Sequence, residues 1–222
     1  MAVKTLPIEA WFKQQGWRAF AFQRRVWRAM AQGQWGLLHA STGSGKTLAT
    51  WFGALARCAA QQTLEPGALK VLWITPMRAL AADTTATLQA SGQDLVPEWR
   101  IEMRTSDTTS AVRARQGKHL PEALVTTPES LSLLLASTDA HARLKSVTVV
   151  IVDEWHELLG SKRGVQVQLA LARLKRWQPQ VIVWGMSATL GNLDHAREAL
   201  TWAHGADAVL VSDDKPKTVA IE

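Results

Sequence analysis

Short apolar runs that alternate with longer helical segments constrain the fold of this chain more than any other feature. The run at 148–152 is β-branched at every position, and the other runs are apolar at nearly every position. Such runs are typical of strands buried on both faces, as in parallel sheets covered by helices. We therefore predict strands at 36–40, 71–75, 123–126, 148–152, 181–186 and 208–211.

Helical patterns fill the intervals between these runs. The predicted helices are 46–60, 77–90, 128–135, 164–177 and 192–204. Within 164–177, a one-sided apolar stripe is formed by Val165, Leu169, Leu171 and Ala172, the pattern of a helix that packs on a core. The alternation predicts an α/β domain with a doubly wound parallel sheet and helices on both faces.

Composition narrows the classes of protein that remain. The 222 residues are 47% hydrophobic and 20% charged, which fits one globular domain and argues against disorder. Cys58 is the single cysteine, so no internal disulfide is possible, and no apolar run reaches the ~18 residues of a membrane span. Residues 1–16 lack a signal-peptide pattern, so we expect a soluble, cytoplasmic protein. The net charge of +6 permits a nucleic-acid partner.

A phosphate-binding loop is the strongest chemical signal in the sequence. It lies between a predicted strand and a predicted helix, and its residues are Ser41, Thr42, Gly43, Ser44, Gly45, Lys46 and Thr47. The glycines let successive N–H groups point at phosphate oxygens, next to the positive end of a helix. We expect Lys46 to reach the β- and γ-phosphates and Thr47 to ligate Mg²⁺. Ala40 stands where the strict pattern has glycine, and a simple Ser/Gly helix cap is the weaker alternative.

An acidic pair follows the most β-rich run. Asp153 and Glu154 come directly after 148–152, at the carboxyl end of a predicted parallel strand, where ligands bind in open α/β sheets. Asp153 can hold Mg²⁺, and Glu154 can orient and deprotonate a water for attack on the γ-phosphate. The alternative is an acidic helix N-terminus, which the helix dipole favours.

These segments resemble motifs I, II and III of the superfamily 2 helicases of the DExH type. The three matching segments are 40–47, Asp153-Glu154-Trp155-His156 and Ser187-Ala188-Thr189. In addition, 16–23 resembles the Q motif, 75–80 motif Ia and 127–130 motif Ib. Segments 104–108 and 153–164 look like the large helicase-related (Lhr) family, and the context of 11–17 is similar to its bacterial ligase-associated DExH-box subgroup.

The resemblance implies a RecA-like P-loop NTPase fold and a role for each matched residue. Gln23 would read the adenine edge, and His156 would couple the nucleotide site to Ser187 and Thr189. The residues that would face the nucleic-acid backbone are Arg78, Thr105, Thr127 and Arg163. On this interpretation the positive excess is located in the loops that carry these residues, and the alternative for much of that excess is ordinary solvated surface.

The resemblance also implies a function for the chain. Family members translocate 3′-to-5′ on single-stranded DNA with ATP and Mg²⁺, and they unwind DNA or RNA–DNA duplexes. We expect a DNA-repair role, partners among repair proteins, and a nucleoid-associated location. The expected organisation is an N-terminal helical extension with the Q motif at 1–30, the first RecA-like domain at 31–215, and the start of a linker at 216–222.

A motor of this superfamily places ATP between two RecA-like domains, and the second supplies arginines to the transition state. Only 33 residues follow Thr189, too few for such a domain. We therefore expect the second domain to be missing from this sequence, and the isolated chain to be weakly active. The alternatives are an RNA-directed DExH helicase, a P-loop kinase or ATPase without a nucleic-acid track, and a nucleic-acid-binding module without catalysis.

Several residues near the motifs have two interpretations. Trp17 or Phe20 could stack on adenine or lie in the core, and Gln23 could be a helix-surface amide. Asp107 could cap a helix that begins near Ser110. The remaining basic residues fit either a solvated helix face or part of a nucleic-acid track, and they are Arg24, Arg25, Arg28, Arg113, Arg115 and Lys118.

Overall fold

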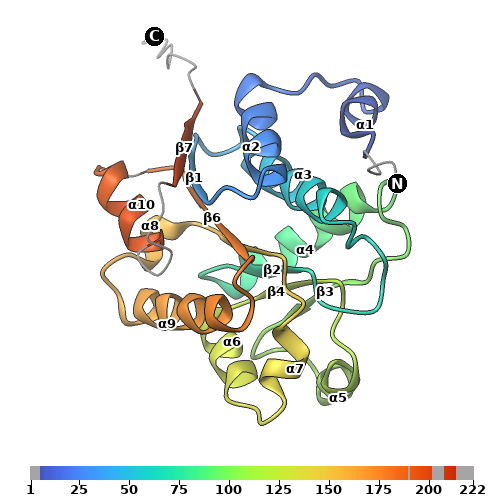
Figure 1. Cartoon of the computed structure of the whole chain (residues 1–222), viewed down its shortest axis with the longest axis vertical. Helices are drawn as coiled ribbons and strands as arrows, with labels where there is room; N and C mark the ends of the chain where they lie inside the picture. Colours follow the sequence, from blue (N-terminus) through green and yellow to red (C-terminus); the bar gives the residue numbers. More distant parts are fainter. Residues whose placement is uncertain (1–5, 190, 202–207, 214–222) are drawn as a thin grey trace.

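Seven strands form one sheet in the computed structural model, which describes residues 6–189, 191–201 and 208–213 (Figure 1). Each pair of neighbouring strands is parallel, and the order across the sheet is β3-β4-β2-β5-β6-β1-β7. The strands are β1 (Gly36–His39), β2 (Val71–Ile74), β3 (Ile101–Arg104), β4 (Ala123–Thr126), β5 (Val149–Val152), β6 (Ile182–Ser187) and β7 (Val209–Ser212). The predicted parallel α/β architecture is confirmed.

Helices cover both faces of this sheet, with α2, α3 and α4 on one side and α6, α7, α9 and α10 on the other (Figure 1). Their bounds are α1 (Ile8–Gln14), α2 (Ala21–Ala31), α3 (Lys46–Ala60), α4 (Arg78–Gly92), α5 (Ser110–Lys118), α6 (Pro128–Leu135), α7 (Ala140–Leu144), α8 (Trp155–Leu158), α9 (Lys162–Trp177) and α10 (Leu193–Thr201). No helix within the described ranges is long and apolar enough to cross a membrane.

Three local predictions need correction. Strand β3 was not predicted, because its sequence alternates apolar with charged residues, as suits the edge of the sheet. Helix α5 is capped by Thr109, whose hydroxyl accepts a hydrogen bond from the N–H of Val112, and not by Asp107. In α9, the side chains of Val165 and Leu169 are 54% and 62% exposed, since the buried stripe of this helix contains Val167, Ala170, Leu171 and Leu174.

The N-terminal helices pack on the same core as the sheet. The rings of Trp11 and Phe12 on α1 contact the ring of Phe52 on α3, with centroids 4.9 and 5.7 Å apart. On α2, the ring of Trp27 lies 5.5 Å from that of Phe12. These aromatic contacts fix α2 beside the start of α3, where the phosphate-binding loop ends. The division at residue 30 stays a prediction, and the predicted linker at 216–222 lies outside the described residues.

Candidate nucleotide site and nucleic-acid groove

The phosphate-binding loop connects the end of β1 to the first turn of α3. Gly43 and Gly45 have φ values of +76° and +88°, a backbone conformation that residues with a Cβ rarely adopt. The N–H of Ser44 donates to the carbonyl of Ser41 at 3.2 Å, which curls the loop back on itself. The loop therefore has the conformation that the glycines predict, with Lys46 and Thr47 at the start of α3.

Lys46 points into this loop. Its ammonium donates to the carbonyls of Ala40 and Ser41, at 2.9 and 3.2 Å, and only 7% of the residue is exposed. Burial lowers the pKa of Lys46, and the opposing charges of Glu154 and Asp153 act against that shift. A charged ammonium held by two neutral carbonyls is a strong donor for a phosphate oxyanion.

The acidic pair lies at the end of β5, as predicted. Asp153 is buried, and its N–H donates to the carbonyl of Ile74 in the neighbouring strand β2 at 2.7 Å. Its carboxylate accepts from the N–H of Glu154 at 2.9 Å and from the indole of Trp73 at 3.4 Å. Burial, followed by the Glu154 carboxylate, raises the pKa of Asp153 to about 6. A buried carboxylate in such a place is stabilised by a cation.

Glu154 has a strained backbone and a free acceptor atom. Its φ of +43° is one of two positive values among the described non-glycine residues, and such strain costs about 1–3 kcal/mol and clusters at functional sites. Within the described part of the chain, its buried Oε2 accepts no hydrogen bond. The same atom lies 3.3 Å from Nδ1 of His156. Glu154 thus has an unused acceptor oxygen, which the predicted general base requires.

His156 joins the acidic pair to the end of β6. Its Nδ1 lies 2.9 Å from Oγ of Ser187, and that hydroxyl lies 3.4 Å from the carbonyl of Thr189. Ser187 is fully buried, whereas Thr189 is exposed. The structure therefore brings together His156, Ser187 and Thr189, the three residues to which the resemblance assigns a coupling role.

Gln23 contacts the phosphate-binding loop directly. Its side chain is buried, with Nε2 donating to the carbonyl of Gly45 at 3.2 Å and Oε1 accepting from the N–H of Phe20 at 2.8 Å. The alternative of a helix-surface amide is therefore wrong. Trp17 and Phe20 are 55% and 41% exposed, so neither is a core aromatic.

The residues of this site fit a nucleotide and Mg²⁺. Two buried oxygens, Oγ of Ser44 and Oε2 of Glu154, have no hydrogen-bond partner among the described residues, so both can serve a ligand. A Cβ added to Gly45 would lie 2.8 Å from Nε2 of Gln23, so the loop is closely fitted to the Q-motif residue. No group of three acidic, histidine or cysteine residues in the described ranges could hold a metal alone. The protein ligands for Mg²⁺ would be Thr47 and Asp153, with the other oxygens coming from phosphate and water.

A concavity lies beyond the carboxyl ends of β2, β3 and β4. We call it the motif groove; its volume is about 710 Å³, and it is lined by Pro76, Met77, Arg78, Ala79, Ser106, Asp107, Thr127, Glu129, Ser130 and Arg163. Three of the four predicted nucleic-acid residues line it: Arg78, Thr127 and Arg163. Thr105 does not, because its side chain is buried and accepts from the N–H of Asp107 at 3.3 Å.

The two arginines of the groove differ in how firmly they are held. Arg78 lies on the surface, with Nη1 2.6 Å from Asp107 and 3.2 Å from the hydroxyl of Ser106. Arg163 donates to both carboxylate oxygens of Glu129, at 2.6 and 3.2 Å, and also to the carbonyl of Pro76. Arg163 thus connects the loop after β2 to the first turn of α6. Arg78, which is held only by exposed groups, is the arginine that a phosphate can recruit at lower cost.

Sequence reasoning missed the acids of this groove. Asp107 and Glu129 each pair with one of its arginines, so the lining carries two positive and two negative side chains. The lining of the motif groove therefore carries no excess of positive side chains, which favours the alternative that the excess lies on other surfaces. The sequence could have revealed these acids, because Asp107 lies within 104–108 and Glu129 within 127–130, two of the segments that carry the family resemblance. The hydroxyl of Thr127 is also occupied, as the N-cap that accepts from Ser130 N–H.

A parallel sheet with a phosphate-binding loop, an acidic pair and a groove across its carboxyl edge defines a RecA-like P-loop ATPase domain. The DEAD/DEAH box helicase family matches residues 20–196. The ATP-dependent helicase Lhr-Core protein 2 of Thermococcus barophilus is 35% identical over 85% of this chain and 23% of its own length. The Lhr helicase/uracil glycosylase of Escherichia coli is 36% identical over 74% of this chain and 12% of its own length.

Solved structures agree with these relatives. A structure of Mycobacterium smegmatis helicase Lhr bound to ssDNA and AMP-PNP aligns over 95% of this chain with a TM-score of 0.75 and 29% identity. The alignment covers 28% of that chain. This chain belongs to the DEAD/DEAH box helicase family, and it corresponds to the first RecA-like domain of an Lhr-type superfamily 2 helicase. It spans about a quarter of the length of the Lhr-Core relatives.

Proposed function

We propose that this domain is the ATP-binding half of a DNA helicase or translocase that moves 3′-to-5′ on single-stranded DNA and serves DNA repair. One observation carries the proposal. The N–H of Asp153 in the nucleotide site donates to the carbonyl of Ile74, at the end of β2, and the loop after β2 leads to Arg78 in the motif groove. A nucleotide at one site can therefore shift the other through a single pair of strands.

The roles within the nucleotide site follow from its geometry. Lys46 would leave the carbonyls of Ala40 and Ser41 for the phosphates of ATP, and Thr47 and Asp153 would hold Mg²⁺. When bound, the metal neutralises phosphate charge. Oε2 of Glu154, which is free of hydrogen bonds in the described chain, would take a proton from the attacking water.

His156 would connect the nucleotide site to the end of β6. His156 lies 3.3 Å from Oε2 of Glu154 and 2.9 Å from Oγ of Ser187, so a change of charge at the base would reach the end of β6. Arginines from a second RecA-like domain would complete the transition-state charge, which can be worth about 10³–10⁵ in rate. The 222-residue chain should therefore hydrolyse ATP poorly and show little stimulation by DNA.

Other parts of the proposal concern the whole protein. Its similarity to Lhr-type helicases, one of them solved with ssDNA and AMP-PNP, supports single-stranded DNA as the track. Membership of the bacterial ligase-associated subgroup, repair proteins as partners and a cytoplasmic, nucleoid-associated location belong to the same proposal. Exposed Trp17 and Phe20, which lie within the Q motif, are suited to stacking on adenine.

The substitution Glu154→Gln tests the catalytic part. It keeps the size of the side chain and removes the basic oxygen, so we expect retained ATP binding and at least a hundredfold loss of hydrolysis. Fluorescent-nucleotide binding measures the first, and phosphate release by the two-domain protein measures the second. Unchanged hydrolysis would remove Glu154 as the base.

The track is tested separately with oligonucleotides. We expect Arg78→Gln to weaken binding of single-stranded DNA without changing ATP binding, because Arg78 lies in the motif groove and not in the nucleotide site. Equal affinity of the variant and the parent would refute the groove as the track. Tighter binding of RNA than of DNA of the same sequence would favour the RNA-directed alternative.

A further inference from the structure

The positive charge of this chain is concentrated in its first segment. Residues 1–35 contain six lysines and arginines and a single acid, Glu9, so they carry +5 of the net +6. The other 187 residues are nearly neutral, and the lining of the motif groove is balanced between arginines and acids. A balanced groove leaves the charge of the N-terminal segment without a role in the proposed track.

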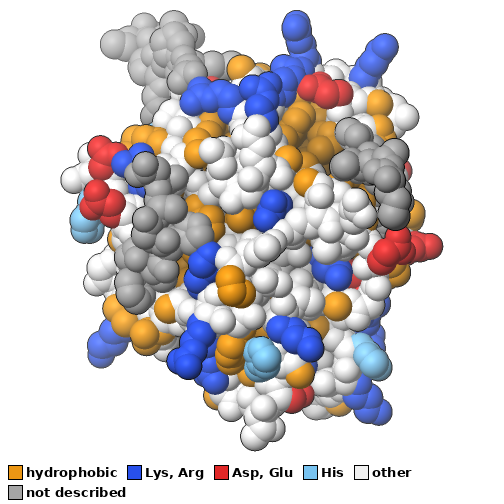
Figure 2. Space-filling view, in the orientation of Figure 1, with side chains coloured by type: hydrophobic (Ala, Val, Ile, Leu, Met, Phe, Trp, Pro, Cys, Tyr) orange, Lys and Arg blue, Asp and Glu red, His pale blue; other side chains and the backbone are white. Residues whose placement is uncertain are grey.

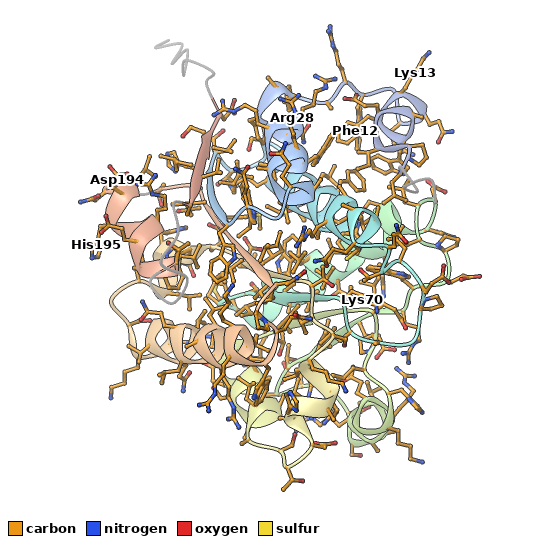
Figure 3. All side chains as sticks on the ribbon, in the orientation of Figure 1. Phe12, Lys13, Arg28, Lys70, Asp194 and His195 are labelled. Carbon is orange, nitrogen blue, oxygen red and sulfur yellow. The ribbon has the colours of Figure 1, made fainter. Side chains whose placement is uncertain are left out.

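The structure gathers these cations at one end of the molecule. We call them the basic patch, which consists of Lys13, Arg18, Arg24, Arg25 and Arg28 on α1, α2 and the segment between them. Figure 2 shows blue side chains gathered over α1 and α2, and Figure 3 labels Lys13 and Arg28 at this end. Arg24 pairs with Glu9, the single acid of residues 1–35, at 2.5 Å, and the side chains of Lys13, Arg18 and Arg28 are exposed.

Two exposed aromatic side chains lie next to the patch. Trp17 and Phe20 are 55% and 41% exposed, although the neighbouring Trp11 and Phe12 are buried. Exposed aromatic side chains beside arginines and lysines are typical of surfaces that bind nucleic acids without regard to sequence. Guanidinium groups match phosphate oxygens in a two-pronged geometry, and four of the five patch cations are arginines.

The patch and the motif groove are far apart on the sheet. Helix α2 packs on α3 and beside β7, at one end of the strand order, whereas the groove lies beyond β2, β3 and β4 near the other end. Five strand spacings separate β4 from β7, which is about 24 Å. The patch therefore cannot hold the same phosphates as the groove.

We propose that the basic patch is a second, sequence-independent DNA site, which holds the backbone of a segment other than the one in the motif groove. A duplex arm that adjoins the single strand fits this site, because a duplex presents one charge per about 1.7 Å to such a surface. The site goes beyond the proposed function and does not depend on the groove.

The test compares two variants that lose the same charge. Arg18→Gln with Arg28→Gln removes two cations from the patch, and Arg173→Gln with Arg176→Gln removes two exposed cations from α9. Binding of a fluorescent DNA duplex with a single-stranded 3′ tail is measured by anisotropy from 50 to 200 mM salt. For the patch variant, we expect the slope of log K against log salt to fall by about 1.4–1.8 and the affinity to fall about tenfold.

The outcomes separate the two proposals. Equal losses in the patch and α9 variants would mean that only net charge matters, and an unchanged slope in the patch variant would mean that no phosphate is bound there; either result overturns the second site. Unchanged melting temperature and nucleotide binding in both variants confirm folding. If Arg78→Gln has no effect while the patch variant loses affinity, the groove fails as the track and the basic patch stands.

Discussion

Asp107 competes with DNA for Arg78, so removing its charge should tighten binding. The two side chains form a 2.6 Å ion pair in which each is 61% exposed, and such pairs contribute only about 0–1 kcal/mol to stability. Asp107→Asn should therefore leave the fold within about 1 kcal/mol of the parent. A phosphate that binds Arg78 would no longer displace a carboxylate, and a repulsion of about 0.7 kcal/mol between charges about 6 Å apart in water would disappear.

Together these effects predict a gain of about 1–1.5 kcal/mol, or about five- to tenfold in affinity for single-stranded DNA. Fluorescence anisotropy with an oligothymidylate measures the gain, and Glu98→Gln is the matched control, since Glu98 is exposed on the loop before β3, at the other end of the strands. The gain should be lost when Arg78→Gln is combined with Asp107→Asn. Weaker binding by Asp107→Asn would refute the reasoning, because Asp107 would then orient Arg78 for phosphate instead of competing with it.

Two further substitutions test the phosphate-binding loop and the buried carboxylate of Glu122, which directly precedes β4. Gly45→Ala should weaken fluorescent-nucleotide binding by about 1.5–3 kcal/mol, because a left-handed alanine costs about 1–2 kcal/mol and the new Cβ would lie 2.8 Å from Nε2 of Gln23. Gly43→Ala is the control, since the space around its Cβ is open, and it should lose less affinity. Equal losses in the two variants would contradict the clash with Gln23. Glu122 is buried and accepts two backbone hydrogen bonds at 2.8 Å, which outweigh burial and hold its pKa below 4.5. Glu122→Gln should therefore lower the free energy of unfolding by about 1.5–3 kcal/mol at pH 7. Denaturant titrations should show this difference becoming smaller below pH 4.5, where the carboxylate of the parent is protonated. A difference that does not change with pH would argue against the charged hydrogen bonds.

The nucleotide site could be predicted because its residues are local in sequence. Lys46 and Thr47 follow their glycines directly, and Asp153 and Glu154 follow the most β-rich run, so spacing alone placed them at strand ends. The groove was predicted in part, because its arginines lie in recognisable motifs but their acidic partners come from other segments of the chain. The pairing of Arg163 with Glu129 joins residues 34 positions apart, and no periodicity in the sequence reports it.

By itself, the sequence determined the parallel α/β class, the phosphate-binding loop and the acidic pair, because apolar runs, glycines and carboxylates act through local backbone geometry. Only the tertiary structure determined which cations pair with acidic side chains and which remain exposed to solvent. Arg78 and Arg163 meet acids across the groove, whereas Lys13, Arg18 and Arg28 stay exposed on α1, α2 and the segment between them. Charge interactions depend on distances between side chains in space, and only the packing of α2 against α3 and β7 sets those distances.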